Sequence, residues 1–368
     1  MSGGRFRVGL IGAGNISDEY LTSLGSYPDI DVIGVADLDI ARAESQAAKY
    51  DLPFAGPVGD LLAREELELV VNLTIPAAHA EVSMAAVAAG KHVWTEKPIT
   101  VDRASAEKLL QAATEHNVTV GGAPDTILGD GIQTSHRLLA GGRIGEAHTL
   151  LTLMQGPGPD AWHPRPQFLF ARGAGPLFDI GPYYVATMAM MLGPIESVQA
   201  LGHTSRSTRT VMAGPDAGAT FPVEVPTHVS VLTRFASGVA GTSIYSFESP
   251  VRRQTFEISG TDGTLLVPVS GFDGPSEIMP MTGDDPEWER VERDGESRAR
   301  GVGVLEMARA LRAGRTPRAS GALAYHVLDT MLAIEESVES GAPVAVRSRF
   351  EPVAPLAATW SSTAATLS

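Results

Sequence analysis

The sequence predicts an N-terminal α/β domain with a doubly wound parallel sheet (residues 1–122), followed by an α+β domain with a large open, mostly antiparallel sheet (residues 123–358). Apolar strand-like runs alternate with helical patterns from Arg5 to Gly122, which is typical of a parallel sheet covered by helices. From Ala123 the chain changes to long alternating runs separated by glycine turns, which is typical of antiparallel strands. With 368 residues, the chain is longer than one hydrophobic core usually supports.

The elements follow from these patterns. In the first domain we expect strands at 6–11, 32–36, 67–74, 93–94 and 118–120, and helices ending at residues 24, 50, 90 and 116. In the second we expect strands at 148–155, 195–201, 224–235, 239–247 and 255–267, and helices at about 129–140, 181–192, 302–313 and 321–340. Loops are expected at 156–159, 205–222 and 271–286, and residues 359–368 are expected to form a frayed tail.

Composition excludes several classes of function. The chain has 28 Lys and Arg against 43 Asp and Glu, a net charge of -15, which argues against binding to nucleic acid or to anionic membranes. It has no cysteine, which excludes disulfides, thiolate chemistry and cysteine-ligated metals. No apolar run approaches the roughly 20 residues that span a bilayer. We therefore expect a cytoplasmic protein that acts on a small molecule.

A glycine turn follows the first predicted strand. Gly12-Ala13-Gly14-Asn15-Ile16-Ser17 lies between the strand and the first helix, which is the arrangement of a Rossmann dinucleotide-binding turn. Gly12 permits the tight turn, and Gly14 lets the backbone approach a pyrophosphate at the helix N-terminus. Ser17 stands where a third glycine is usual, and it is small enough for close packing of helix and strand.

Asp37 follows the second strand, twenty-three residues after Gly14. A carboxylate at this spacing suits the ribose hydroxyls of NAD, and it would repel the 2′-phosphate of NADP. We therefore expect NAD rather than NADP as the cofactor. Arg42, one helical turn further on, is the nearby cation that would soften this preference, and we expect it to point to solvent. Asp39 is expected to cap the helix over 40–50.

A charged pair follows the short strand at 93–94. Glu96 and Lys97 come where Pro98 ends the strand, at the edge of an open parallel sheet where ligands bind. The alternative is a surface ion pair. His79, near the start of a helix, is either part of this edge or a capping histidine.

The second domain holds further candidates. Asp179 and Tyr183 are four residues apart around a helix start expected near Gly181, so that both point to one cavity; the alternative is an N-cap and a buried aromatic ring. Further candidate pocket residues, which would otherwise be ordinary loop or packing residues, are Asp125, Trp162 and His163. No spacing of His, Asp and Glu indicates a metal site.

On the Glu96-Lys97-Pro98 motif, the glycine turn and the Asp179 segment, the chain resembles the glucose–fructose oxidoreductase, inositol dehydrogenase and MocA-like family over nearly its whole length. The resemblance implies a cis Lys97–Pro98 bond and a catalytic set of Lys97, Asp179 and Tyr183. Tyr183 stands where inositol dehydrogenases carry histidine, while the glucose–fructose branch and dihydrodiol dehydrogenases also use tyrosine. The implied cofactor-binding residues are Gly12, Gly14, Asn15, Ile16, Asp37, Thr74, Pro76, His79, Glu96 and Lys97.

These features predict an NAD-dependent oxidoreductase acting on a secondary hydroxyl or ketone of a sugar, glycoside or cyclitol, with Lys97, Asp179 and Tyr183 touching the substrate. Either Lys97 or Tyr183 would transfer the hydroxyl proton, and Asp179 would hold the sugar. The alternatives are a redox-assisted glycosidase or lyase that retains NAD, and a regulator that binds the dinucleotide without turnover. An open sheet face in the second domain predicts a homodimer or homotetramer.

Overall fold

The computed structural model describes residues 4–269, 271–283, 285–293, 295–296 and 298–367. These residues form two compact units. The first consists of the described residues of Met1–Asp130, Asp294–Leu328 and Val353–Ser368, and the second of those of Gly131–Arg293 and Asp329–Pro352. The first unit is therefore built from three separate pieces of chain, whereas the expected division had assigned 123–358 to one domain.

The first unit contains a six-stranded parallel sheet with the order β3-β2-β1-β4-β5-β6. Its strands are β1 (Phe6–Ile11), β2 (Ile30–Ala36), β3 (Ala55–Gly56), β4 (Leu69–Asn72), β5 (His92–Thr95) and β6 (Val120–Gly122). The central strands are almost completely buried, which explains why they read as continuous apolar runs. This confirms the predicted doubly wound parallel sheet.

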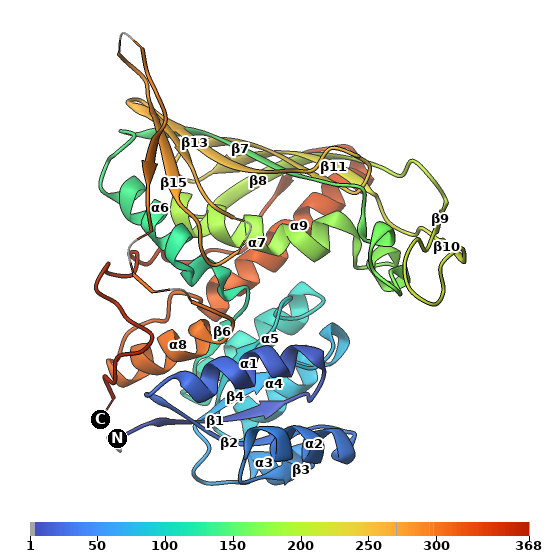
Figure 1. The fold of residues 1–368 in the computed structure, drawn as a ribbon, viewed down its shortest axis with the longest axis vertical. Coiled ribbons are helices and arrows are strands. Elements are labelled where there is room, and N and C mark those ends of the chain that lie inside the picture. Colours follow the sequence, from blue (N-terminus) through green and yellow to red (C-terminus); the bar gives the residue numbers. More distant parts are fainter. Residues whose placement is uncertain (1–3, 270, 284, 294, 297, 368) are drawn as a thin grey trace. The chain divides into compact units, whose positions relative to one another are not determined.

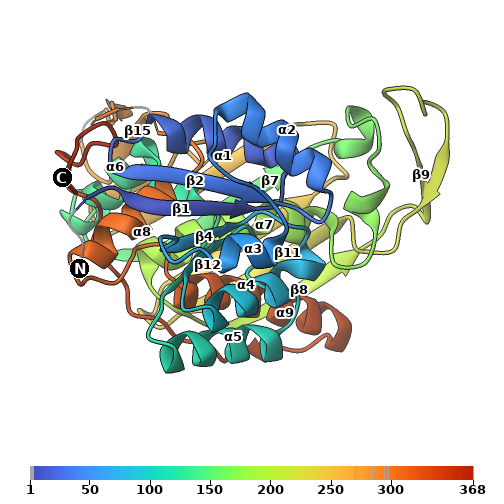
Figure 2. The same cartoon turned by 90° about the horizontal axis from the view of Figure 1, so that it is seen from below.

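Helices cover both faces of this sheet. Helices α1 (Asn15–Ser26) and α2 (Ile40–Tyr50) pack together on one face, and α4 (His79–Ala88) and α5 (Arg103–Glu115) pack together on the other (Figure 2). The short α3 (Val58–Leu62) follows β3, and α8 (Val302–Arg312) contacts α1 and β6. The strands and helices that alternate along the sequence thus form a layered α/β unit, with the sheet between two layers of helices.

The last residues of the chain are held in the first unit. The buried carboxylate of Asp29 accepts hydrogen bonds from the backbone N–H groups of Thr366 and Leu367, at 2.7 and 2.9 Å, and from the Thr366 hydroxyl. Arg309 of α8 pairs with Asp29 at 2.7 Å and donates to two carbonyl oxygens of the tail. The ring of Trp360 lies 4.8 Å from this guanidinium. A tail that we expected to be frayed is therefore tied down by one buried acid.

The second unit contains a nine-stranded sheet with the order β16-β15-β14-β13-β7-β12-β11-β8-β17. All its neighbouring strands are antiparallel except the pair of β7 with β12, so it is mostly antiparallel, as predicted. Its strands are β7 (Ala147–Gln155), β8 (Ile195–His203), β11 (His228–Phe235), β12 (Ala240–Ser246), β13 (Arg253–Gly260), β14 (Gly263–Leu266), β15 (Ser276–Pro280), β16 (Glu289–Val291) and β17 (Val344–Ala345).

Helix α7 (Gly175–Leu192) packs on β7, β11 and β12, and with α6 (Asp130–Ala140) it lies on one side of this sheet (Figure 1). The boundaries between the two units fall at the first residue of α6 and within α9 (Gly321–Ser340). The core of the second unit lies between the sheet and α7, where Tyr184 stacks on Phe256 and meets Tyr245 edge to face.

The expected start of α7 near Gly181 is wrong. The helix begins at Gly175, whose φ of 82° and close approach to Val225 suit only glycine, and Pro176 occupies the first turn, where its missing N–H costs nothing. Gly181 and Pro182, where the start was expected, lie inside the helix. Asp179 is therefore a helical residue and not an N-cap.

Two expected loops contain strands. The segment 205–222 includes a two-stranded ribbon of β9 (Thr208–Thr210) and β10 (Thr220–Pro222), and the segment 271–286 includes β15. The remaining short helical turns are η1 (Pro76–Ala78), η2 (Asp125–Leu128), η3 (Pro159–Ala161) and η4 (Gln167–Phe170). Within the described residues, no helix has the length and apolarity to cross a membrane.

Candidate active site

The glycine turn of the first unit has the geometry that its sequence indicates. Gly12 has a φ of 106°, and a Cβ there would lie 2.7 Å from the backbone of Leu73, so only glycine fits. Gly14 caps α1, and space is open on the side where its Cβ would be. Asn15 and Ile16 form the first turn of α1 and expose its N–H groups.

A cavity of about 450 Å³ adjoins this turn. Gly12, Gly14, Asp37 and Thr74 line it, but Asn15, Ile16, Pro76, His79, Glu96 and Lys97 are not among its lining residues. Its apolar walls include Leu38 and Ile75, which are 96% and 70% exposed. Apolar side chains exposed to this extent beside a cavity are suited to packing against a flat ring.

Asp37 connects β2 to the glycine turn. Its Oδ2 accepts a hydrogen bond of 2.7 Å from the Ala13 N–H, and its Oδ1 accepts one of 2.9 Å from the Asp39 N–H. The Arg42 side chain is 66% exposed, as expected of a residue that points to solvent, but it also lines the cavity and lies 3.1 Å from the carboxylate of Asp39. Asp37, which was expected to bind the ribose hydroxyls, is thus fixed beside the glycine turn, and the nearby Arg42 is paired with Asp39.

Two buried side chains shape the turn after β4. The Oδ1 of Asn72 accepts hydrogen bonds from the Thr74 hydroxyl and N–H, and its amide donates to the His79 carbonyl. The ring nitrogens of His79 lie 2.6 Å from the Pro98 carbonyl oxygen and 2.9 Å from that of Thr74. His79 is neither an exposed capping residue nor a cavity residue: it joins the Thr74 turn to the residue after Lys97.

The Lys97–Pro98 bond is cis, as the family resemblance implied. Beside it, Glu96 is held on both oxygens: Oε1 accepts from the Tyr20 hydroxyl at 2.9 Å, and Oε2 accepts from the Lys97 N–H at 2.9 Å. Burial, followed by the charge of Glu96, raises the pKa of Tyr20 well above its usual value, so this hydroxyl remains a donor. Arg300 approaches the same carboxylate at 3.6 Å. Glu96 is therefore part of the support of Lys97.

Asp125 is placed differently from its predicted role in substrate binding. It is fully buried in the first unit, and its Oδ2 accepts a hydrogen bond of 2.7 Å from the N–H of Gly301, at the start of α8. Burial, with the charge of Glu96 as the next contribution and Arg300 acting against both, raises the pKa of Asp125 to about 7. Asp125 therefore holds α8 and does not line the cavities described here.

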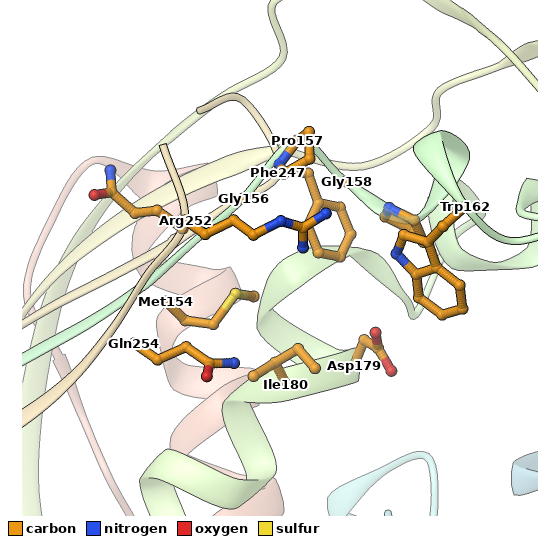
Figure 3. A pocket seen from close by; sticks show the side chains of 12 residues that line it. Met154, Gly156, Pro157, Gly158, Trp162, Asp179, Ile180, Phe247, Arg252 and Gln254 are labelled. Atoms are coloured by element: carbon orange, nitrogen blue, oxygen red, sulfur yellow. The ribbon is translucent and has the colours of Figure 1, made fainter. Parts of the chain in front are cut away.

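The second unit has a cavity of about 410 Å³ on the helix-covered face of its sheet. Figure 3 shows the side chains that surround it. It brings together Trp162 and Asp179, two of the predicted substrate residues. Sequence reasoning missed its other polar and aromatic side chains, which are Gln155, Phe247, Arg252 and Gln254.

Two predicted residues of this unit, Tyr183 and His163, do not line the cavity but are close in the chain to residues that do. Asp179 and Tyr183, at positions i and i+4 of α7, share one helix face and are both half-buried. Tyr183 is not among the lining residues. His163 packs edge-on between Trp162 and Phe168, and its Nδ1 accepts from the Arg165 N–H, so it anchors the loop that carries Trp162. Lys97 belongs to the first unit and Asp179 and Tyr183 to the second.

A buried arginine supports the cavity wall. Arg209 pairs with Asp160 at 2.9 Å and with Glu248 at 2.7 Å, and it donates to the carbonyl oxygens of Pro157 and Phe247. Because these partners come from two separate segments, one guanidinium fixes the loop around η3 against the residues that follow β12. An arginine in a predicted loop gave no sequence signal for this role.

Among the described residues, no group of three or more His, Asp and Glu side chains is arranged to hold a metal ion. The first cavity instead has the features that a dinucleotide needs: a glycine turn at a helix N-terminus, an acid for ribose hydroxyls and apolar walls. The residues present therefore fit NAD, which would be held by Gly12, Gly14, Asp37 and Thr74.

Comparison with known families gives two matches. The model for "Oxidoreductase family, NAD-binding Rossmann fold" matches residues 6–122, and the model for "GFO/IDH/MocA C-terminal domain" matches residues 132–266. Together they cover the parallel sheet and the main strands of the second sheet.

Individual relatives are more distant. The chain is 26% identical to trans-1,2-dihydrobenzene-1,2-diol dehydrogenase of Mus musculus, over 74% of this chain and 77% of the relative. It is 28% identical to dTDP-3,4-didehydro-2,6-dideoxy-alpha-D-glucose 3-reductase of Streptomyces antibioticus, over 71% and 75%. Among solved structures, an NAD binding oxidoreductase from Klebsiella pneumoniae superposes with a TM-score of 0.83 at 25% identity, over 94% of this chain and all of that one. A levoglucosan dehydrogenase in complex with NADH and L-sorbose, at 20% identity and a TM-score of 0.81, has the same fold over 94% of this chain and all of that one.

The raised pKa of Asp125 predicts a pH effect on stability. The folded protein holds a proton on this carboxyl up to about pH 7, whereas the unfolded chain loses it near pH 3.8, the ordinary pKa of an aspartate. The free energy of unfolding therefore falls as the pH rises from about 3.8 to about 7. For one proton the slope is about 1.4 kcal/mol per pH unit. Asp125→Asn should remove this part of the slope, because an amide does not titrate. The variant should still fold, because the amide oxygen can accept the hydrogen bond from the Gly301 N–H.

Urea unfolding of both proteins at several pH values from 4 to 8 measures the effect. Asp102→Asn is the matched control, because hydrogen bonds from Ser105 lower the pKa of Asp102 and its contribution has the opposite sign. Equal slopes for wild type and Asp125→Asn would show that Asp125 is ionised throughout this range.

Proposed function

Because the chain belongs to the Gfo/Idh/MocA family of NAD-binding oxidoreductases, we propose that it is an NAD-dependent dehydrogenase of a sugar, glycoside or cyclitol. The observation that carries this proposal is the cavity in the second unit, which is lined by the carboxylate of Asp179, the amide of Gln254 and the aromatic rings of Trp162 and Phe247. Carboxylates and amides bind hydroxyl groups, and an aromatic ring packs on the apolar face of a sugar. The names of relatives that act on a dihydrodiol and a dideoxy sugar support the same substrate class.

Oxidation of a secondary alcohol transfers hydride from the carbon to the nicotinamide and removes the proton of the hydroxyl, which leaves a ketone and NADH. We assign the proton to Lys97 or to Tyr183. Lys97 is suited to this role because its backbone is held in place. Glu96, itself fixed by Tyr20, accepts a hydrogen bond from the Lys97 N–H, and His79 binds the carbonyl oxygen of Pro98. Asp179 lines the cavity and accepts a hydrogen bond from a substrate hydroxyl, and this bond orients the carbon that loses hydride.

We further propose a homo-oligomer formed through the second unit. Helix α7 covers one face of the sheet, and the other carries the exposed side chains of Leu201 and Leu232, which are 73% and 57% exposed. Leu201 pairs with Ser230 of β11, two residues from Leu232, so the two leucines lie on adjacent strands of one face. A second copy of the same face would remove both from water.

Replacement of Lys97 tests the enzymatic proposal. Lys97→Met should lower kcat for NADH formation by roughly a hundred- to ten-thousandfold, the usual effect of losing an acid/base group. The assay supplies NAD with a panel of sugars, cyclitols and glycosides and follows NADH absorbance. Lys108→Met, on the exposed surface of α5, is the matched control and should retain turnover. Normal turnover by folded Lys97→Met would exclude its catalytic role, and bond cleavage without net NADH would indicate a redox-assisted glycosidase.

The choice of cofactor is tested at Asp37. Wild type should give a higher kcat/KM with NAD than with NADP, because the 2′-phosphate would face the fixed carboxylate of Asp37. Asp37→Ala should narrow this ratio, even if loss of the Ala13 hydrogen bond weakens both cofactors. Glu81→Gln removes the other acid that lines the cavity and should leave the ratio close to that of wild type. If the wild type preferred NADP, Asp37 would not determine the choice of cofactor, and Arg42 would be the residue that binds the 2′-phosphate.

The oligomer proposal predicts a dimer or tetramer in sedimentation at micromolar concentration. Leu232→Glu would place a charge in each copy of the proposed interface, so it should shift the protein toward monomer. The matched control is Met281→Glu, which changes an exposed apolar residue that follows β15. A monomeric wild type would disprove the proposal.

A further inference from the structure

Strand alternation directs Arg252 into the cavity of the second unit. On β13, Phe256 and Ile258 are buried and Phe256 stacks on Tyr184 of α7, so residues at even positions face the helix-covered side of the sheet. Gln254 pairs with Met154, and both line the cavity. Arg252 continues the same series, one residue before β13 begins, and its side chain extends into the cavity in Figure 3.

The loop that carries Arg252 is fixed to the cavity wall. The Ser249 N–H donates to the Gly156 carbonyl at 3.1 Å, and the Gly156 N–H donates to the Ser246 carbonyl at 3.0 Å. The Ser249 hydroxyl and the backbone of Val251 hydrogen-bond to each other and close the turn before Arg252. The guanidinium is therefore carried by a braced turn beside the end of β7.

The charge of Arg252 is not neutralised within the described part of the chain, where no carboxylate pairs with it. The neighbouring basic side chains are already engaged: Arg209 is paired with Asp160 and Glu248, and Arg253, on the opposite face, donates to Gln155. The charged residues that line the cavity are Arg252, from the loop before β13, and Asp179, from α7. The cavity thus has a cationic and an anionic wall.

We propose that this enzyme acts on a sugar or polyol that carries a carboxylate, which Arg252 binds while Asp179 accepts a hydroxyl. This inference rests on the proposed function and specifies its substrate class. A guanidinium matches the two oxygens of a carboxylate with two parallel N–H donors, and such a bond is stronger than one to a neutral hydroxyl. A single cation facing Asp179 matches one negative charge, whereas a phosphate ester would bring close to two.

Matched substrates test the proposal. D-Glucuronate, D-galacturonate and D-gluconate are compared with D-glucose, D-galactose and D-glucitol, with saturating NAD, and D-glucose 6-phosphate is added as a second anion. The acids should give the higher kcat/KM, and calorimetry should show tighter binding of the acids to the NAD-loaded protein. Arg252→Met should reduce kcat/KM for the preferred acid by roughly ten- to a hundredfold, as expected for loss of a charge-assisted hydrogen bond, mainly through KM.

Control variants separate charge from position. Arg253→Met removes an equal charge one residue away, on the other face of β13, and should keep the ratio of acid to neutral substrate. Arg252→Lys keeps the charge without the planar fork and should recover part of the affinity. The proposal is overturned if neutral sugars or the phosphate ester are preferred, or if Arg252→Met and Arg253→Met lower the ratio equally. Turnover of neutral sugars alone would overturn this inference and leave the dehydrogenase proposal standing, whereas no NADH from any substrate in the wider panel would overturn both.

Discussion

The carboxyl edge of the parallel sheet depends on buried polar side chains that bind the backbone of its turns. Where strands end, N–H and C=O groups lose their ladder partners, and leaving them unpaired away from water costs free energy. Asp37 binds the glycine turn, Asn72 and His79 bind the turn at Thr74, and Glu96 binds the N–H of Lys97. These bonds hold the glycine turn and Lys97 in place, so the shape of the dinucleotide cavity follows from the need to satisfy the backbone.

The same requirement explains what the sequence predicts well. Gly12 and Asp37 have roles that depend on neighbours in the chain and on a regular sheet, so their spacing is enough to locate them. The long apolar runs of β1, β2 and β4 are likewise determined by burial on both faces. The types of both sheets and the edge that carries the glycine turn were therefore predictable from pattern alone, whereas the pieces of chain at 294–328 and 353–368 that complete the first unit were not.

Other features depend on distant partners. The helix α7 was expected to begin near Gly181, but it already begins at Gly175 and Pro176, where the chain passes close to Val225. Asp125 looked like a pocket residue because it follows the last strand of the parallel sheet, yet its partner is Gly301, 176 residues away. Arg209 and Arg252 belong to unremarkable polar segments, and only the tertiary structure makes one a buried brace and the other a cavity wall.

The tail held by Asp29 has a consequence for synthesis of the chain. The strands of the first unit are complete by Gly122, but its remaining pieces, α8 and the tail segment at Trp360 and Thr366, leave the ribosome only after most of the second unit. Arg309 and the tail are the partners of the buried carboxylate of Asp29, so that carboxylate stays without them until residues 309 and 366 have been synthesised. The nucleotide-binding half therefore matures last, although it begins first, and chains that terminate early would carry an incompletely folded first unit beside a second unit that has all its strands.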